Sequence, residues 1–146
     1  MLEAEGIIKV EHGQRMVVDL DEDFSKYYSW FIQQRYWVKP SLPLHRSHIT
    51  IAGKQFHKGV DWDRAVDYHG QRVKFQYDPY LVEGGFTKGF IMFYIKVFSD
   101  EIDQIKKDIG VIESDIYRGL HVTIGSIFKS GSKAKLYWPE LITIKN

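Results

Sequence analysis

The chain has 146 residues, 44% of them hydrophobic and 27% charged, a composition typical of one compact globular domain. It contains no cysteine, which excludes disulfides, thiolate metal ligands and a cysteine nucleophile and fits a reducing cytoplasm. The formal net charge of +1 argues against a protein that coats long duplex DNA, and no apolar run reaches the roughly 18 residues that span a bilayer. We therefore expect a cytoplasmic protein that does not enter membranes, and the sequence indicates no obligate protein partner.

The first half of the chain predicts two strands, a helix, a loop and a third strand. The β-branched runs 6–10 and 16–20 are typical of strands, and Gly13 between them suits a turn. Residues 21–37 predict a helix with an acidic start. Its apolar residues recur at helical spacing: Phe24, Tyr27, Tyr28, Phe31 and Ile32. Pro40 and Pro43 then indicate a loop, and the strand that follows holds His48.

The second half repeats this order after a charged connector that we expect to be partly helical. Residues 72–82 and 90–98 predict two strands, joined through the glycine-containing segment 83–89 as a hairpin. Ser99 suits a helix N-cap and Gly110 a helix end, and a strand with His121 follows a short loop. Each histidine follows its predicted helix by about 11 residues, so we interpret the chain as a degenerate internal duplication.

Both final strands carry a His-x-Thr motif, His48 to Thr50 and His121 to Thr123. Side chains two residues apart in a strand share one face and lie about 6.6 Å apart, so each histidine has a hydroxyl beside it. A lone histidine on a strand is more often a surface or core residue, but two matched pairs could flank one phosphodiester. One neutral imidazole would accept a proton from a 2′-hydroxyl and one imidazolium would protonate the leaving 5′-oxygen, while the threonines bind the non-bridging oxygens.

The stretches SHITIA (47–52) and LHVTIG (120–125) resemble the two His-x-Thr/Ser-x signatures of the 2H phosphoesterase superfamily. The resemblance implies an α+β bilobal fold, in which two strand-strand-helix-strand halves have antiparallel sheets flanking a central cleft. It also implies metal-independent chemistry without a cofactor. His48 and His121 would be the acid/base pair, with Thr50 and Thr123 as phosphate ligands. We expect one domain over 1–146, with lobes at about 1–58 and 70–130 and segment 131–146 packing back.

The length and layout also resemble the phage anti-CBASS nucleases, which degrade cyclic di- and trinucleotide signals of bacterial immune systems. This narrower resemblance implies a cyclic oligonucleotide, or another small RNA-type phosphodiester, as substrate. Two alternatives stay open. One is a 2′,3′-cyclic phosphodiesterase or 2′–5′ RNA ligase-like enzyme that acts on RNA ends, and the other is a catalytically inert nucleotide-binding module. The two motifs are too alike to show which histidine is the base and which the acid.

Several further residues are candidate substrate contacts. Cations close to the motifs could pair with a phosphate, although solvated charges at strand ends are commoner; they are Arg46, Lys54, Arg118 and Lys129. Tyr117 could reach the cleft, and Trp138 with Glu140 could stack on and hydrogen-bond a base, although Trp138 could equally fill the core.

A metal site is the remaining possibility that the sequence raises. His45 and His48 form a His-x-x-His pair with His57 nearby, but no carboxylate follows in register. We therefore expect no metal.

Overall fold

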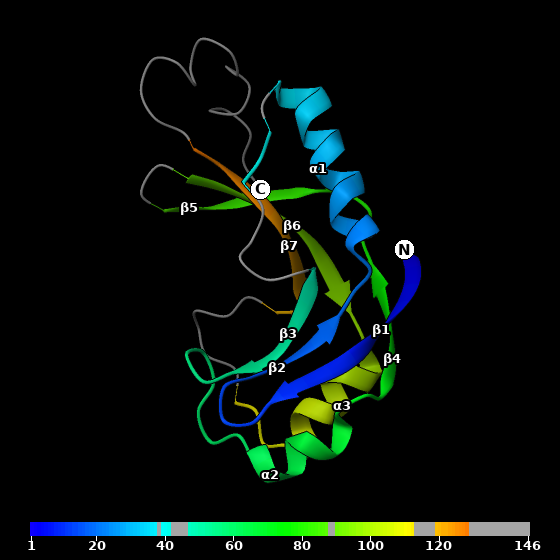
Figure 1. Cartoon of the computed structure of the whole chain (residues 1–146), viewed down its shortest axis with the longest axis vertical. Helices are drawn as coiled ribbons and strands as arrows, with labels where there is room; N and C mark the ends of the chain where they lie inside the picture. Colours follow the sequence, from blue (N-terminus) through cyan, green and yellow to red (C-terminus); the bar gives the residue numbers. More distant parts are fainter. Residues whose placement is uncertain (38, 42–46, 88–89, 113–118, 129–146) are drawn as a thin grey trace.

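The computed structural model describes residues 1–37, 39–41, 47–87, 90–112 and 119–128 (Figure 1). Within these ranges the chain forms seven strands, three α-helices and one 3₁₀ turn. In chain order they are β1 (Leu2–Glu11), β2 (Arg15–Asp19), α1 (Glu22–Tyr36), β3 (His48–Gly53), α2 (Trp62–Ala65), the 3₁₀ turn η1 (Val66–Tyr68), β4 (Arg72–Tyr77), β5 (Val82–Thr87), β6 (Phe90–Phe98), α3 (Asp100–Asp108) and β7 (His121–Phe128). The predicted α+β class is confirmed.

The strands form one seven-stranded antiparallel sheet in the order β4-β1-β2-β3-β7-β6-β5. The two strands that carry the motifs, β3 and β7, are therefore neighbours, and the order outward from them is mirrored: β2 and β1 on one side, β6 and β5 on the other. β4 pairs with β1 and also with β6, where Gln76 lies opposite Phe98. The sheet therefore curls until its two halves meet again at β4. We expected two sheets, but the strands belong to one.

The first half has the predicted order β1-β2-α1-β3, and β5-β6-α3-β7 repeats it, but β4 precedes the repeat as an additional strand. The prediction of one strand over 72–82 is wrong, because β4 ends at Tyr77 and β5 begins at Val82. Pro79 lies in this gap and has no amide hydrogen to donate to a strand ladder. Residues 83–87, which we expected in the hairpin connection, belong to β5. Gly84 suits that strand because a Cβ there would lie 3.3 Å from the Tyr94 ring.

Side-chain caps fix the starts of the two longer helices where the sequence predicts them. The Asp21 carboxylate accepts the amide hydrogen of Asp23 at 2.9 Å at the start of α1. At the start of α3, the Ser99 hydroxyl accepts the amide hydrogen of Ile102 at 3.1 Å. Gly110, with a φ of 75°, follows α3 as predicted, because glycine adopts this left-handed conformation without strain.

Only part of the predicted apolar face of α1 is buried. Tyr28 and Ile32 lie in the core, whereas Tyr27 and Phe31 remain 60% and 39% exposed. The Tyr28 hydroxyl donates to the Pro79 carbonyl at 2.9 Å, and burial raises the pKa of this phenol to about 12. The helix thus packs through a narrower stripe than its spacing of aromatic residues suggests.

The core lies behind the central strands. Ile49 and Ile51 of β3 and Val122 and Ile124 of β7 are fully buried, and Ile32 of α1 belongs to the same cluster. Each such side chain contributes about 1.5–3 kcal/mol when it leaves water. Ile49 and Val122 alternate with the motif residues, so the histidines and threonines lie on the other face of the sheet. Burial of one face thereby fixes which side chains the other face presents.

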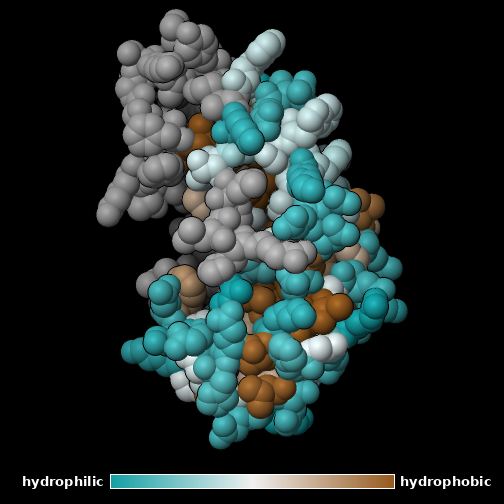
Figure 2. Space-filling model, in the orientation of Figure 1, coloured by the Kyte–Doolittle hydropathy of each residue, from teal (hydrophilic) through white to brown (hydrophobic). Residues whose placement is uncertain are grey.

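Hydrophilic residues cover most of the described surface seen in Figure 2, and hydrophobic patches interrupt it mainly in the lower half. In the described part of the chain, no helix has the length and apolar character that crossing a bilayer requires.

Candidate active site

The pairing of β3 with β7 brings the two motifs together. Ile49 lies opposite Val122 in an antiparallel register. One residue to either side, His48 therefore lies beside Thr123, and Thr50 lies beside His121. Directly opposed residues have Cβ atoms about 4.5–5.5 Å apart, and diagonal neighbours are about 7–8 Å apart. The two imidazoles are diagonal neighbours, so a single phosphate group fits between them.

All four motif side chains are half-buried, whereas the residues between them are fully buried. Polar groups in this position remain accessible to a ligand but are held by a rigid strand on either side. The sequence therefore predicts correctly that each pair shares a face, and the register adds that both pairs share the same face.

A β-bulge follows each motif at the same position. Between β2 and β3 the pairing steps from Val17–Thr50 to Met16–Ala52, which leaves Ile51 as the extra residue. Between β6 and β7 it steps from Tyr94–Thr123 to Phe93–Gly125, which leaves Ile124 as the extra residue. Bulges re-aim neighbouring side chains and are common beside active sites. Their matching positions support the interpretation of the two halves as a duplication.

The ring of His121 is oriented by a backbone carbonyl. Its Nδ1–H donates to the Gly119 oxygen at 3.1 Å, because a carbonyl can only accept. Nε2 is then the nitrogen that can exchange a proton with a ligand. Gly119 has a φ of 78°, a left-handed conformation that glycine adopts readily. The Tyr94 ring lies edge-on against the imidazole, with centroids 5.6 Å apart and planes at 68°.

The outer strands place opposite charges beside the two histidines. On β2, Asp19 lies directly opposite His48. On β6, Lys96 lies directly opposite His121. Opposed residues in an antiparallel pair point to the same face, so both charges lie on the face that carries the motifs. The histidines have the same sequence context but different charged neighbours.

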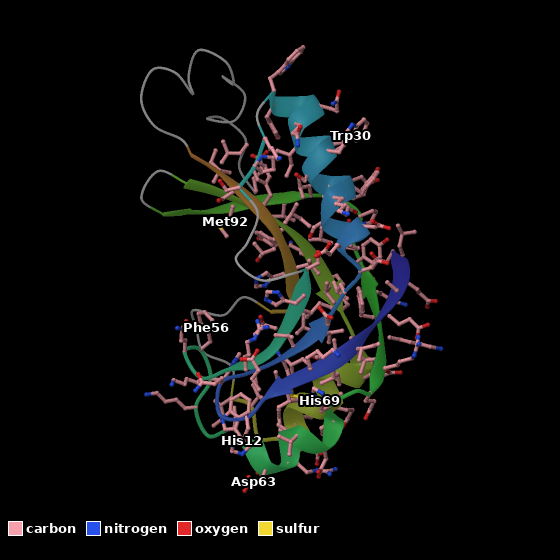
Figure 3. All side chains as sticks on the ribbon, in the orientation of Figure 1. His12, Trp30, Phe56, Asp63, His69 and Met92 are labelled. Atoms are coloured by element: carbon pink, nitrogen blue, oxygen red, sulfur yellow. The ribbon has the colours of Figure 1, made fainter. Side chains whose placement is uncertain are left out.

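A pocket of about 370 Å³ adjoins the first motif. Residues of β2 and β3 and of the turns that follow β1 and β3 line it. Figure 3 labels Phe56, which is one of the lining residues. The lining residues are Glu11, Gln14, Arg15, Val17, His48, Thr50, Gly53, Lys54, Gln55 and Phe56. The volume is in the range of ordinary small-molecule sites.

Four neighbours of the motifs are absent from the sequence-based prediction: Arg15, Asp19, Tyr94 and Lys96. A signal is present on β6, where Tyr94 and Lys96 alternate with the buried Ile95, but not on β2, where three buried apolar residues separate Arg15 from Asp19. That alternation indicates a polar face only once the strand partners are known. Of the predicted substrate contacts, Lys54 lines this pocket. The others lie outside the described residues, and they are Arg46, Tyr117, Arg118, Lys129, Trp138 and Glu140.

Two of the three possible zinc ligands, His48 and His57, lie within the described residues. His57 is buried, and its Nδ1 accepts the amide hydrogen of Gly53 at 3.1 Å, so this ring supports the turn after β3. His45 lies outside the described residues. In the described ranges, no three histidine, aspartate or glutamate side chains gather in a way that could hold a metal ion.

No protein-family model matches the chain, and comparisons with curated proteins and with solved structures found no match either.

Proposed function

We propose that this chain is a metal-independent phosphodiesterase that cleaves RNA-type 3′–5′ linkages by two-histidine acid/base catalysis. The observation that carries the proposal is the Ile49–Val122 register, which sets His48, Thr50, His121 and Thr123 on one face of two adjacent strands. This arrangement supplies two proton-transfer groups and two hydroxyl donors within reach of one phosphate. It is also what a bilobal 2H-phosphoesterase-like fold would require of its central strands.

The reaction needs no redox partner. The 2′-oxygen next to the scissile phosphate attacks phosphorus, and its proton passes to the neutral histidine. The bond from phosphorus to the 5′-oxygen breaks, and the protonated histidine gives its proton to that oxygen. The products are a 2′,3′-cyclic phosphate and a free 5′-hydroxyl, and the two histidines have exchanged protonation states. Attack by water on the cyclic phosphate restores both histidines. Hydrogen bonds from Thr50 and Thr123 to the non-bridging oxygens would stabilise charge in the transition state.

The charged neighbours differ between the two histidines, with Asp19 beside His48 and Lys96 beside His121. We propose that His48 protonates the leaving oxygen. His121, whose ring is oriented through Nδ1, would remove the 2′-proton through Nε2. Gly119 and Tyr94 act as positioning groups for the His121 ring.

The favoured substrates are cyclic di- and trinucleotides. The resemblance of the chain to phage anti-CBASS nucleases supports this choice, and so does the small pocket beside the first motif, which suits a nucleotide better than a long duplex. The proposal gives the protein a role in immune evasion in the host cytoplasm, where such signals are made.

A substrate panel in the presence of EDTA tests the proposal. It contains 3′,3′-cyclic dinucleotides, a cyclic trinucleotide, 2′,3′-cyclic mononucleotides and short RNA, with products separated by chromatography. We expect cleavage of a cyclic oligonucleotide, and we expect its 2′-deoxy analogue to bind but survive, because it lacks the attacking oxygen. Cleavage of the deoxy analogue would contradict the mechanism. Turnover of only the mononucleotides or RNA would move the function to RNA ends, and binding without turnover would identify a nucleotide-binding module.

A further inference from the structure

The pocket beside His48 and Thr50 carries two cationic side chains that the proposed chemistry does not use. Arg15, at the start of β2, lies opposite Gly53, at the end of β3. Lys54 is the next residue, and its amide donates to the Gln14 carbonyl at 3.0 Å, which ties together the two turns that wall the pocket. This hydrogen bond therefore holds the backbone in place next to both Arg15 and Lys54.

These cations lie to one side of the reacting phosphate. Gly53 is about 10 Å along β3 from Thr50, so a group held beside Arg15 and Lys54 is distinct from the phosphate held between the histidines. The same pocket contains the Glu11 carboxylate, which accepts from Arg15 Nε at 3.2 Å. The pocket's charged residues other than His48 therefore sum to one positive charge, and Glu11 restrains the Arg15 side chain.

An aromatic side chain completes the pocket. Phe56 is 44% exposed, and its ring packs over Gly53, where a Cβ would lie 3.4 Å from the Phe56 Cδ2 atom. Aromatic rings stack on nucleobases with little sequence preference, and arginine and lysine bind phosphate. A phosphate-binding pair beside an aromatic wall has the chemistry needed to recognise a nucleotide.

We propose that this pocket binds the nucleotide next to the scissile linkage, with Arg15 and Lys54 on a second phosphate that is not cut and Phe56 against the base. The inference rests on the proposed function and narrows it. It selects substrates that carry at least two phosphates, such as cyclic dinucleotides, over a linear dinucleoside monophosphate with the same scissile bond.

The test compares two substrates that differ in the second phosphate. Values of kcat/KM are measured in EDTA for 3′,3′-cyclic diadenylate and linear ApA, and for the corresponding guanine pair. The enzymes are the wild type, Arg15→Gln, Lys54→Gln and the double variant. Arg72→Gln on β4 and Lys107→Gln on α3 serve as matched controls, because both are exposed residues outside the pocket. Lys54→Gln lies on a surface turn, so it tests the pocket even if Arg15→Gln disturbs folding.

We expect the double variant to lower the ratio of cyclic to linear kcat/KM about tenfold, which corresponds to about 1.4 kcal/mol of discrimination. The two controls should leave the ratio unchanged. An unchanged ratio in the double variant would overturn the pocket assignment while the proposed function stood.

Calorimetric binding of cyclic diadenylate and cyclic diguanylate to His48→Ala separates the remaining cases. If the wild type cleaves nothing but the double substitution weakens this binding about tenfold, the proposed function fails and the pocket assignment stands. If neither cyclic dinucleotide binds, both fail.

Discussion

Replacing Gly119 with alanine tests how His121 is held. Gly119 has a φ of 78°, and no described atom lies within 4 Å of the position that a Cβ would take. The substitution therefore adds no clash with the described residues. It should lower the stability of the fold by about 1–2 kcal/mol, because alanine is strained in the left-handed region. An alanine relieves that strain by turning its backbone, which moves the carbonyl that accepts from His121 Nδ1.

Gly70→Ala is the matched control. Gly70 has a φ of 87°, again with no described atom within 4 Å of a Cβ, and it lies between η1 and β4, away from the motif strands. Urea unfolding should show the same loss of about 1–2 kcal/mol in both variants. Cleavage of a cyclic dinucleotide should fall about tenfold or more in Gly119→Ala only, because a positioned acid or base contributes about 10²–10⁴-fold. Equal activity of the two folded variants would refute the orienting role of the Gly119 carbonyl.

Three further predictions follow from the same geometry. The pH dependence of kcat/KM should be bell-shaped, because one histidine must be neutral and the other charged; a flat profile between about pH 5 and 8 with chemistry rate-limiting would contradict this. His48→Ala should lose far less activity on a nucleoside 3′-(4-nitrophenyl phosphate) than on a cyclic dinucleotide, since nitrophenolate leaves without an acid. Equal losses would reverse the assignment of His48 as acid. Burial, and to a lesser extent the hydrogen bond to Glu83, raises the pKa of Tyr36 from 10.0 to about 12. The protonated phenol therefore contributes its full share of the unfolding free energy below pH 10, and this contribution is lost as the pH rises to 12. Between pH 10 and 12, the unfolding free energy of Tyr36→Phe should therefore fall less steeply than that of the wild type, by up to about 1.4 kcal/mol per pH unit. Equal slopes would show that Tyr36 ionises freely in the folded state.

Local features were predictable from the sequence because they depend on neighbouring residues. The caps at Asp21 and Ser99 and the helix end at Gly110 use hydrogen bonds and dihedral angles within a few residues. The alternation of apolar and polar residues likewise shows that Ile49 and Val122 are buried while each histidine shares a face with its threonine.

Long-range features were not predictable in the same way. Which strands are neighbours, and in which register, depends on contacts between residues far apart in the chain. The opposition of Ile49 and Val122 is one such feature, and the positions of Asp19 and Lys96 beside the histidines are another. The pocket beside Arg15 also depends on the strand pairing. The sequence alone could therefore supply the four motif residues but not the neighbours that distinguish the two histidines.

The most direct test of the two-histidine site is single-turnover cleavage of a cyclic dinucleotide in EDTA by the wild type, His48→Ala, His121→Ala and the double variant. We predict that each single substitution lowers the rate about 10²–10⁴-fold. The double substitution should lower it by much less than the product of the two, because the histidines act as a unit. Retention of the wild-type rate by either single variant would contradict the two-histidine mechanism.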